Sequence, residues 1–327
     1  PDDLARVSLL KGAAEGQVAG YTAFGPAVDG IYGVAVDQEG EIVWYYRDDN
    51  IRAKQSARKL QSLANGHLLL MTGRGFRVVT PMGEIITEYS GGGSRSSIHH
   101  DVISLPNGHF LALTNESKTL DVPELGGENL VLGDVVVEID ETGQVVWSWS
   151  TFDYLDTSRY PSALSKKQSQ GDNGLDWTHA NSLDYDAEDD TFLVSLRSQH
   201  WVIKVSKATG EVLWRFGAGG DFTLNEGDWF YAQHHAVWHG DSLTLYDNGN
   251  ERPDTEPIVS QGVRYSIDET MMSASVVQSY ASSLFTQRFG STQWLDNEHL
   301  LMCFGGIGKQ EKAQIVQADE QGVPVWQ

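Results

Sequence analysis

A short pattern of alternating apolar residues, placed after a turn that contains glycine, recurs along the chain. Copies stand at residues 40–44, 83–86, 143–147, 210–214 and 322–326, and most end in an aromatic residue. A second hairpin signal precedes several copies, at residues 64–70, 105–111 and 295–301. Strict alternation on both sides of a tight turn is typical of an antiparallel hairpin. Each repeating unit is therefore predicted to hold two hairpins, which is about four strands.

The units begin near residues 20, 60, 98, 177, 231 and 290. Once the long insertions are set aside, the period is roughly 40 to 55 residues, which is typical of a β-propeller. We therefore predict an all-β fold, a six-bladed β-propeller with four-stranded antiparallel blades. The whole chain, residues 1–327, is predicted to form one domain.

The ends and the insertions carry further expectations. Residues 1–19 are interpreted as an N-terminal extension. The last unit ends at Trp326 without a clear fourth strand, so we expect either that the segment around residues 17–24 completes it or that the native protein continues beyond Gln327. Residues 151–175 and 217–230 are predicted to be long loops over the funnel of the propeller, because loops of this length are usually functional or disordered. Their aromatic residues are candidate lid residues: Tyr154, Tyr160, Phe222 and Phe230.

Histidines stand at the predicted start of the first strand in three successive units. They are His100, His179 and His234, and His99 and His235 adjoin the first and the last. The connections into the first strands of a propeller lie around its axis, so we expect these side chains to converge. Arg197 ends the hairpin that follows His179 and is expected to join them. One histidine before a strand is usually a turn or capping residue, but three at one repeat position favour a site. The other histidines, at 67, 109, 200, 239 and 299, are interpreted as surface residues.

Charge sharpens this prediction. Lys plus Arg is 23 and Asp plus Glu is 45, so the net charge is -22, and we expect no nucleic-acid partner and no membrane partner. A cluster of imidazoles and a guanidinium would be locally cationic in this acidic chain. It suits a tetrahedral oxyanion, because Arg offers a planar fork of donors and imidazole can act as nucleophile or proton carrier. The single cysteine, Cys303, excludes an intrachain disulfide and is interpreted as a small core residue.

Other readings of the same residues stay open. His100, His179 and His234 could ligate a metal ion with Asp101 or Asp176. A non-catalytic binding propeller would instead use Trp177, Trp229, Tyr231 and Trp238 as a recognition surface. Residues 247–251 carry the oxygen ligands of a calcium loop but lack its length and final Glu, so we interpret them as a turn. Residues 305–309 lack the first glycine and the Ser or Thr of a phosphate loop.

Several motifs stand together in one order. They are Ile98-His99-His100-Asp101, then Asp176-Trp177-Thr178-His179-Ala180-Asn181-Ser182 with Ser195-Leu196-Arg197, then Gln233-His234 with Leu245-Tyr246-Asp247-Asn248-Gly249 and Arg252. In this the chain resembles the bacterial arylsulfate sulfotransferases over roughly residues 20–326. The resemblance implies a six-bladed β-propeller that moves a sulfuryl group from an aryl sulfate to a phenol by a ping-pong route, without a nucleotide sulfate donor.

The resemblance also implies roles for residues. His234 would carry the sulfuryl group, His179 and Arg197 would hold its oxygens, and His100 would bind it or move a proton. Further candidates for substrate binding are Trp177, Asn181, His235, His99, Tyr231, Asn248 and Arg252. Among these, Asn248 is expected to orient His234. No cofactor and no metal are implied, and the location expected from the family is periplasmic or secreted. The acceptor, including water, and the oligomeric state stay open.

Overall fold

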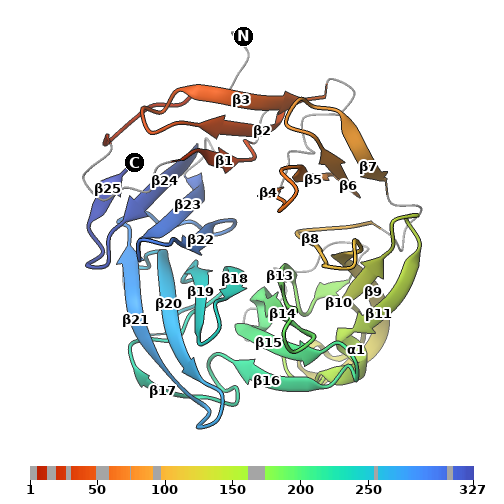
Figure 1. Ribbon diagram of the computed structural model, residues 1–327. Helices are drawn as coiled ribbons and strands as arrows, with labels where there is room; N and C mark the ends of the chain where they lie inside the picture. Colours follow the sequence, from red (N-terminus) through yellow and green to blue (C-terminus); the bar gives the residue numbers. More distant parts are fainter. Residues whose placement is uncertain are drawn as a thin grey trace. The chain divides into compact units, whose positions relative to one another are not determined.

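The computed structural model describes residues 6–12, 20–26, 31–48, 59–73, 75–90, 97–160, 174–253, 257–307 and 312–327. These residues form six sheets, in which consecutive strands are paired almost throughout in antiparallel fashion (Figure 1). The predicted fold class is confirmed: the chain is an all-β, six-bladed β-propeller.

The first three sheets take up residues 22–150. The first holds β1 (Thr22–Phe24), β2 (Ile31–Val36) and β3 (Ile42–Arg47). The second holds β4 (Leu60–Ser62), β5 (Leu68–Thr72), β6 (Gly75–Val79) and β7 (Ile85–Tyr89). The third holds β8 (Val102–Ser104), β9 (Phe110–Val122), β10 (Gly127–Ile139) and β11 (Val145–Ser150). The 3-10 helix η2 (Pro123–Leu125) joins the long strands β9 and β10.

The last three sheets follow the same plan. The fourth holds β13 (Ala180–Asp186), β14 (Thr191–Leu196), β15 (Trp201–Ser206) and β16 (Val212–Phe216). The fifth holds β18 (His234–Trp238), β19 (Ser242–Asp247), β20 (Gln261–Asp268) and β21 (Ser273–Ala281). The sixth holds β22 (Ser291–Trp294), β23 (Leu300–Ile307), β24 (Lys312–Ala318) and β25 (Pro324–Trp326). The first strand of each sheet begins within four residues of its predicted position.

The prediction for the end of the chain was wrong in one respect. The sixth sheet has its own fourth strand, β25, and β1 pairs with β2 in the first sheet. The repeat copy at residues 322–326 itself supplies this strand, which starts at Pro324 on the edge of the sheet, where proline is tolerated. In the N-terminal extension, the amides of Leu10 and Lys11 donate to the carbonyl of Gln327.

The two insertions contain regular structure. Residues 151–154 form the short helix α1 (Thr151–Tyr154), and β12 (Leu175–Asp176) pairs parallel with β10. Residues 161–173 lie outside the described part of the chain. Within residues 217–230, β17 (Thr223–Glu226) pairs parallel with β21, at the edge of its sheet opposite to β18. These extra strands are short and parallel, which leaves no hairpin signal in the sequence.

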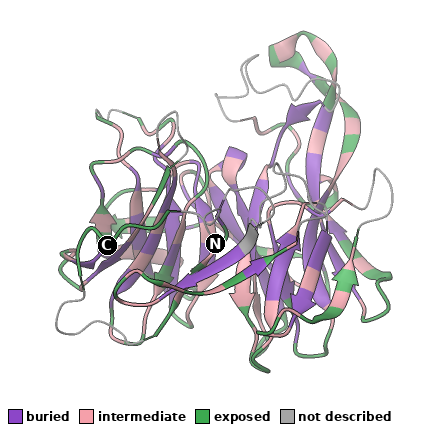
Figure 2. Cartoon of the chain, turned by 90° about the horizontal axis from the view of Figure 1, so that it is seen from above, coloured by how far each residue is buried: buried purple, intermediate pink, exposed green. Residues whose placement is uncertain are grey.

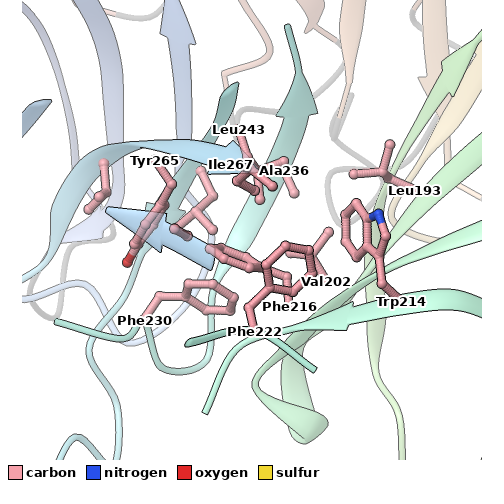
Figure 3. Packing of buried hydrophobic residues seen from close by; sticks show 13 residues of the cluster. Leu193, Val202, Trp214, Phe216, Phe222, Phe230, Ala236, Leu243, Tyr265 and Ile267 are labelled. Carbon is pink, nitrogen blue, oxygen red and sulfur yellow. The ribbon is translucent and has the colours of Figure 1, made fainter. Parts of the chain in front are cut away.

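The described chain divides into two compact units. One comprises residues 1–114, 137–147 and 325–327, and the other comprises residues 115–136 and 148–324. In the second unit, aromatic and aliphatic side chains from the fourth and fifth sheets form one buried cluster (Figure 3). Phe222 and Phe230 belong to this cluster, so they pack in the core and do not act as lid residues.

Burial explains the hydrophobic pattern. All residues of β14 and of β19 are buried, although each strand also contains polar residues. Strands such as β3 alternate between partly buried and exposed residues. Buried residues run through the strands in Figure 2, and exposed residues gather at the turns. No helix among the described residues is long and apolar enough to cross a membrane.

Candidate active site

His234 is the first residue of β18 and is buried. Its Nδ1 lies 2.7 Å from Oδ1 of Asn248, which follows the neighbouring strand β19. The pairing of His234 with Tyr246 in these two strands brings the imidazole and the amide together. The prediction that Asn248 orients His234 therefore has a direct contact behind it.

The surroundings of Asn248 determine which nitrogen of His234 carries the proton. Nδ2 of Asn248 donates to the carbonyls of Thr286 (2.8 Å) and Phe289 (2.9 Å). Two carbonyls can only accept, so the amide nitrogen must face them and the amide oxygen must face His234. Oδ1 can also only accept, so Nδ1 of His234 is the donor. In the neutral ring the lone pair then belongs to Nε2.

The imidazole of His234 is held in its neutral form. Burial, assisted by the charge of Arg197, lowers the pKa of His234 from 6.5 to about 3. The hydrogen bonds to Asn248 and to the Ala232 backbone oppose this shift, and His179 adds to it. A buried, neutral imidazole with a defined tautomer is suited to act as a nucleophile.

His179 precedes β13 and has a different partner. Its Nδ1 is bonded to Oδ2 of Asp176, three residues earlier on β12. An ionised carboxylate accepts hydrogen bonds only, so Nδ1 is again the donor. A carboxylate beside an imidazole orients the ring and stabilises its cationic form, which suits a residue that takes up and gives back protons.

Arg197 follows β14 and opens the 3-10 helix η5 (Arg197–Gln199). Its amide donates to the carbonyl of His179, which ties the two residues together. Within the described residues, its guanidinium donates one hydrogen bond, from Nη2 to the carbonyl of Gln287 (3.3 Å), and forms no ion pair. Burial lowers the pKa of Arg197, and the carboxylates of Glu251 and Asp176 oppose that shift. A desolvated guanidinium without a paired carboxylate is suited to hold an anion.

The backbone around these residues is strained. His179 has a φ of 49°, His235 has a φ of 51°, and Ala232 has a φ of 54°. Residues other than glycine rarely adopt this left-handed region, and such strain clusters at functional sites. His100, in the other compact unit, has a φ of 56°.

Asn181 and His235 hold backbone around the site. Nδ2 of Asn181 donates to the carbonyl of Gln233, directly before His234 (2.7 Å). Nδ1 of His235 donates to the carbonyl of Thr292 on β22 (3.0 Å). Both residues therefore fix the chain on either side of the His234 imidazole, and a contact with substrate stays a prediction for each.

Three other predicted residues are engaged in packing or ion pairing. Trp177 is buried, stacks on Phe152 and donates from Nε1 to the carbonyl of Arg159. The guanidinium of Arg252 pairs with the buried carboxylate of Asp247.

Asp247 also accepts a hydrogen bond from the amide of Tyr231 (3.0 Å). The ring of Tyr231 is tilted against that of His200. Contacts of Trp177, Tyr231 and Arg252 with substrate stay predictions. In the structure, each of the three residues contacts other residues of the protein.

His99 and His100 lie in the first compact unit. Their Nδ1 atoms are 2.9 Å apart, and the rings meet edge to face. The adjacent Asp101 pairs with Nζ of Lys59 at 2.6 Å. His179, Arg197 and His234 belong to the second unit, so the convergence of His100 with them stays a prediction.

With this geometry in place, the comparison with protein families becomes informative. The family model described as arylsulfotransferase (ASST) matches residues 27–324. The chain belongs to the arylsulfotransferase family.

Curated relatives in this family carry the name arylsulfate sulfotransferase AssT. The one from Escherichia coli is 24% identical over 311 residues, which cover 75% of this chain and 52% of the relative. The one from Lelliottia amnigena is 24% identical over 324 residues, which cover 77% of this chain and 54% of the relative. The chain thus spans about half the length of the curated arylsulfotransferases it matches.

A solved structure of a protein of unknown function from Bacteroides caccae is similar in fold. Its TM-score is 0.54 at 11% identity, and the match covers 99% of this chain and 93% of that chain. At this identity the likeness supports the fold and carries no functional argument.

The structure adds site residues that the sequence did not reveal. Asp176 appeared only as a candidate metal ligand, and the loop that holds Asn248 and Arg197 carried no signal. Two histidines interpreted as surface residues are also placed differently. His299 is buried, and Nδ1 of His200 accepts a hydrogen bond from the amide of Ala232 (2.9 Å).

The metal readings gain no support from the side-chain arrangement. The part of the chain that the structure describes contains no group of three His, Cys, Asp or Glu side chains that could hold a metal ion. Asp247, in the candidate calcium loop, is occupied by Arg252, by Gln261 and by the amides of Tyr231 and Gly249. Residues 247–252 therefore form a turn closed by internal bonds.

Proposed function

We propose that this arylsulfotransferase moves a sulfuryl group from an aryl sulfate to a phenol through a sulfohistidine at His234, without a nucleotide sulfate donor. The observation that carries the proposal is the neutral imidazole of His234, with its proton fixed on Nδ1, beside a desolvated Arg197. The family membership and the names of the curated relatives support the substrate class.

In the first half-reaction, the lone pair of His234 Nε2 attacks sulfur and the bond between sulfur and the aryl oxygen breaks. The leaving aryloxide takes a proton from His179, whose ring is oriented by Asp176. Arg197 stabilises the non-bridging sulfuryl oxygens, where charge accumulates as in phosphoryl transfer.

In the second half-reaction, a phenol replaces the departed aryl group. His179 takes the phenolic proton as the phenol oxygen attacks sulfur. The bond between sulfur and Nε2 breaks, and its electron pair returns to the His234 ring. The neutral ring is thereby regenerated with its proton still on Nδ1, so one residue set serves both directions.

The family resemblance also motivates a periplasmic or secreted location and a contribution from His100. We propose both on that basis. Fractionation of the native host and a His100→Ala variant would test them separately.

The experiment for the proposed function is intact-protein mass spectrometry after brief incubation with 4-nitrophenyl sulfate in the absence of a phenol. The expected result is one added sulfuryl group, release of nitrophenol and location of the group on His234. His234→Gln is expected to abolish the adduct, and the neighbouring His235→Gln is expected to retain it.

Addition of a phenol should discharge the adduct and yield the new aryl sulfate. An adduct that survives in His234→Gln would refute the assignment of the nucleophile. Discharge by water at the same rate as by phenol would instead identify a hydrolase.

A further inference from the structure

The loop between β21 and β22, residues 282–290, contacts both halves of the site. The carbonyls of Thr286 and Phe289 accept from Asn248, and the carbonyl of Gln287 accepts from Arg197. Three backbone oxygens within four residues thus hold the side-chain amide of Asn248, which orients His234, and the guanidinium of Arg197. A displacement of this loop would disturb the nucleophile and the anion-binding group together.

The base of the loop is rigid. The Thr286 side chain is fully buried and bonded to the hydroxyl of Tyr246 (2.6 Å), and its amide donates to Oγ of Ser260 (2.9 Å). Gly290 has a φ of 112°, and a Cβ there would lie 2.3 Å from the Tyr246 ring. The position of Phe289, between Thr286 and Gly290, is therefore fixed by buried contacts on both sides.

Phe289 itself is exposed and strained. Its φ is 65°, and 44% of its surface is accessible to solvent. A bulky residue in the left-handed region is strained, and such strain is usually retained only where the position serves a function. Burial of the ring does not explain its presence, because almost half of the residue stays in contact with water.

Two glycines of β23 make room for this ring. A Cβ at Gly305 would lie 3.1 Å from Cβ of Phe289, and one at Gly306 would lie 3.3 Å from its Cδ2. Gly306 also has a φ of 68°. The glycine pair that resembles a fragment of a phosphate loop in the sequence therefore has a steric role, since it supports one side of Phe289.

The exposed Phe289 ring lies beside a positively charged side chain, and this combination suits an aromatic anion. The guanidinium carbon of Arg288 lies 5.3 Å from the centroid of the Phe289 ring, which is within range of a cation–π contact. A phenyl ring and a guanidinium side by side offer a stacking surface and positive charge to one ligand. The Phe289 backbone is joined to His234 through a single intervening side chain, that of Asn248.

We propose that Phe289 is a specificity-determining residue that binds the aryl ring of the donor and of the acceptor, with Arg288 beside it. The inference rests on the proposed function for the identity of the ligand. It extends that function by assigning recognition of the aromatic ring to the loop 282–290, for which no sequence pattern predicts a role.

The test compares two inert ligands, benzylsulfonate and methanesulfonate. In both, sulfur is bonded to carbon, so no group can be transferred and binding alone is measured by calorimetry. Wild type is expected to prefer benzylsulfonate. Phe289→Leu keeps an apolar side chain but is expected to lose about fivefold in affinity for benzylsulfonate, in line with the strength of an aromatic pair. Its affinity for methanesulfonate should not change.

Phe285→Leu is the matched control, because Phe285 lies in the same loop and has a similar exposed fraction of 41%. It is expected to leave both affinities unchanged. The proposal is overturned if wild type does not prefer benzylsulfonate to methanesulfonate, or if Phe289→Leu keeps the wild-type preference. It is also overturned if Phe285→Leu loses as much of this preference as Phe289→Leu does. Failure of the proposed function would appear separately, as the absence of an adduct at His234.

Discussion

His234 and His179 stand at the starts of neighbouring first strands and donate from the same ring nitrogen, yet their partners differ in charge. Asn248 gives His234 a neutral acceptor, and Asp176 gives His179 a carboxylate. His234 is buried, and the His179 side chain retains 22% exposure. Two histidines at equivalent repeat positions thus have different surroundings: burial lowers the pKa of His234 to about 3 and keeps its ring neutral, and His179 is oriented by a carboxylate.

Arg197 helps to hold His234 neutral and is the proposed anion-binding group, so its removal should have the largest effect. Arg197→Ala is expected to lower the rate of adduct formation by about 10²- to 10³-fold, since one donor to a developing oxyanion contributes this much. Its melting temperature should not fall, because Arg197 has no ion pair within the described residues. Stopped-flow release of nitrophenol and calorimetry measure the two quantities.

Arg252→Ala is the matched variant, because it removes the guanidinium that pairs with the buried Asp247. It should unfold more easily, by about 3–5 kcal/mol, since a buried charge is left without its partner. An Arg197→Ala variant that loses stability to the same extent would contradict the assignment of Arg197 to anion binding.

Asn248→Asp makes the partner of His234 resemble that of His179. The carboxylate cannot donate to Thr286 and Phe289, and it raises the pKa of His234 by favouring the charged ring. We expect about a 100-fold slower formation of the adduct at pH 7, with part of the loss recovered at pH 9, where the ring is neutral again.

Asn250→Asp introduces the same charge two residues away and should change the rate little. Equal losses in both aspartate variants, or a loss at position 248 that does not depend on pH, would show that the neutral state of the His234 ring does not control the rate.

Asp176→Asn makes the partner of His179 resemble that of His234. A neutral partner no longer favours the cationic ring, so a smaller fraction of the variant holds a proton to give to the leaving group. The rate with phenyl sulfate should fall by about tenfold, and the rate with 4-nitrophenyl sulfate should change less, since nitrophenolate leaves without a proton. Equal losses for the two donors would argue against proton transfer by His179.

A further expected effect concerns stability. The folded chain keeps His234 neutral down to about pH 3, and the unfolded chain protonates it near pH 6.5. Between these values the unfolded state binds the extra proton, so this contribution to stability is complete above pH 6.5 and is lost as the pH falls. The loss is at most about 1.4 kcal/mol per pH unit.

Urea unfolding of wild type and His234→Gln at several pH values measures this contribution as a difference in slope, which removes the background from carboxylates. Identical slopes would mean that the ring is not held neutral by the fold.

The fold was predictable because the sequence of most blades contains a recognisable hairpin pattern. Alternation, a glycine turn and a period located the first strand of each sheet. The extra strands were not predictable, because β12 and β17 pair in parallel with strands distant in sequence. Each of these strands forms by pairing with a strand that becomes available only when the sheet has folded.

Candidate site residues could be predicted from the sequence where a side chain carries the chemistry. Repeat position predicts His179, Arg197 and His234, the resemblance adds Asn248, and their roles stay predictions. The electrostatic partner of His179 and the loop 282–290 were missed. That loop acts through the carbonyls of Thr286, Gln287 and Phe289, which every residue type has, so no sequence pattern could indicate them. Arg252 was assigned to substrate because the sequence does not show that Asp247 already pairs with it.

The protonation of the His234 ring can be observed by ¹⁵N NMR of the histidine rings in wild type and His234→Gln between pH 4 and pH 8. We expect the signals lost in the variant to belong to a neutral ring with a proton on Nδ1 and none on Nε2, unchanged across this range. A proton on Nε2 at neutral pH, or a ring that becomes charged near pH 6, would contradict this expectation.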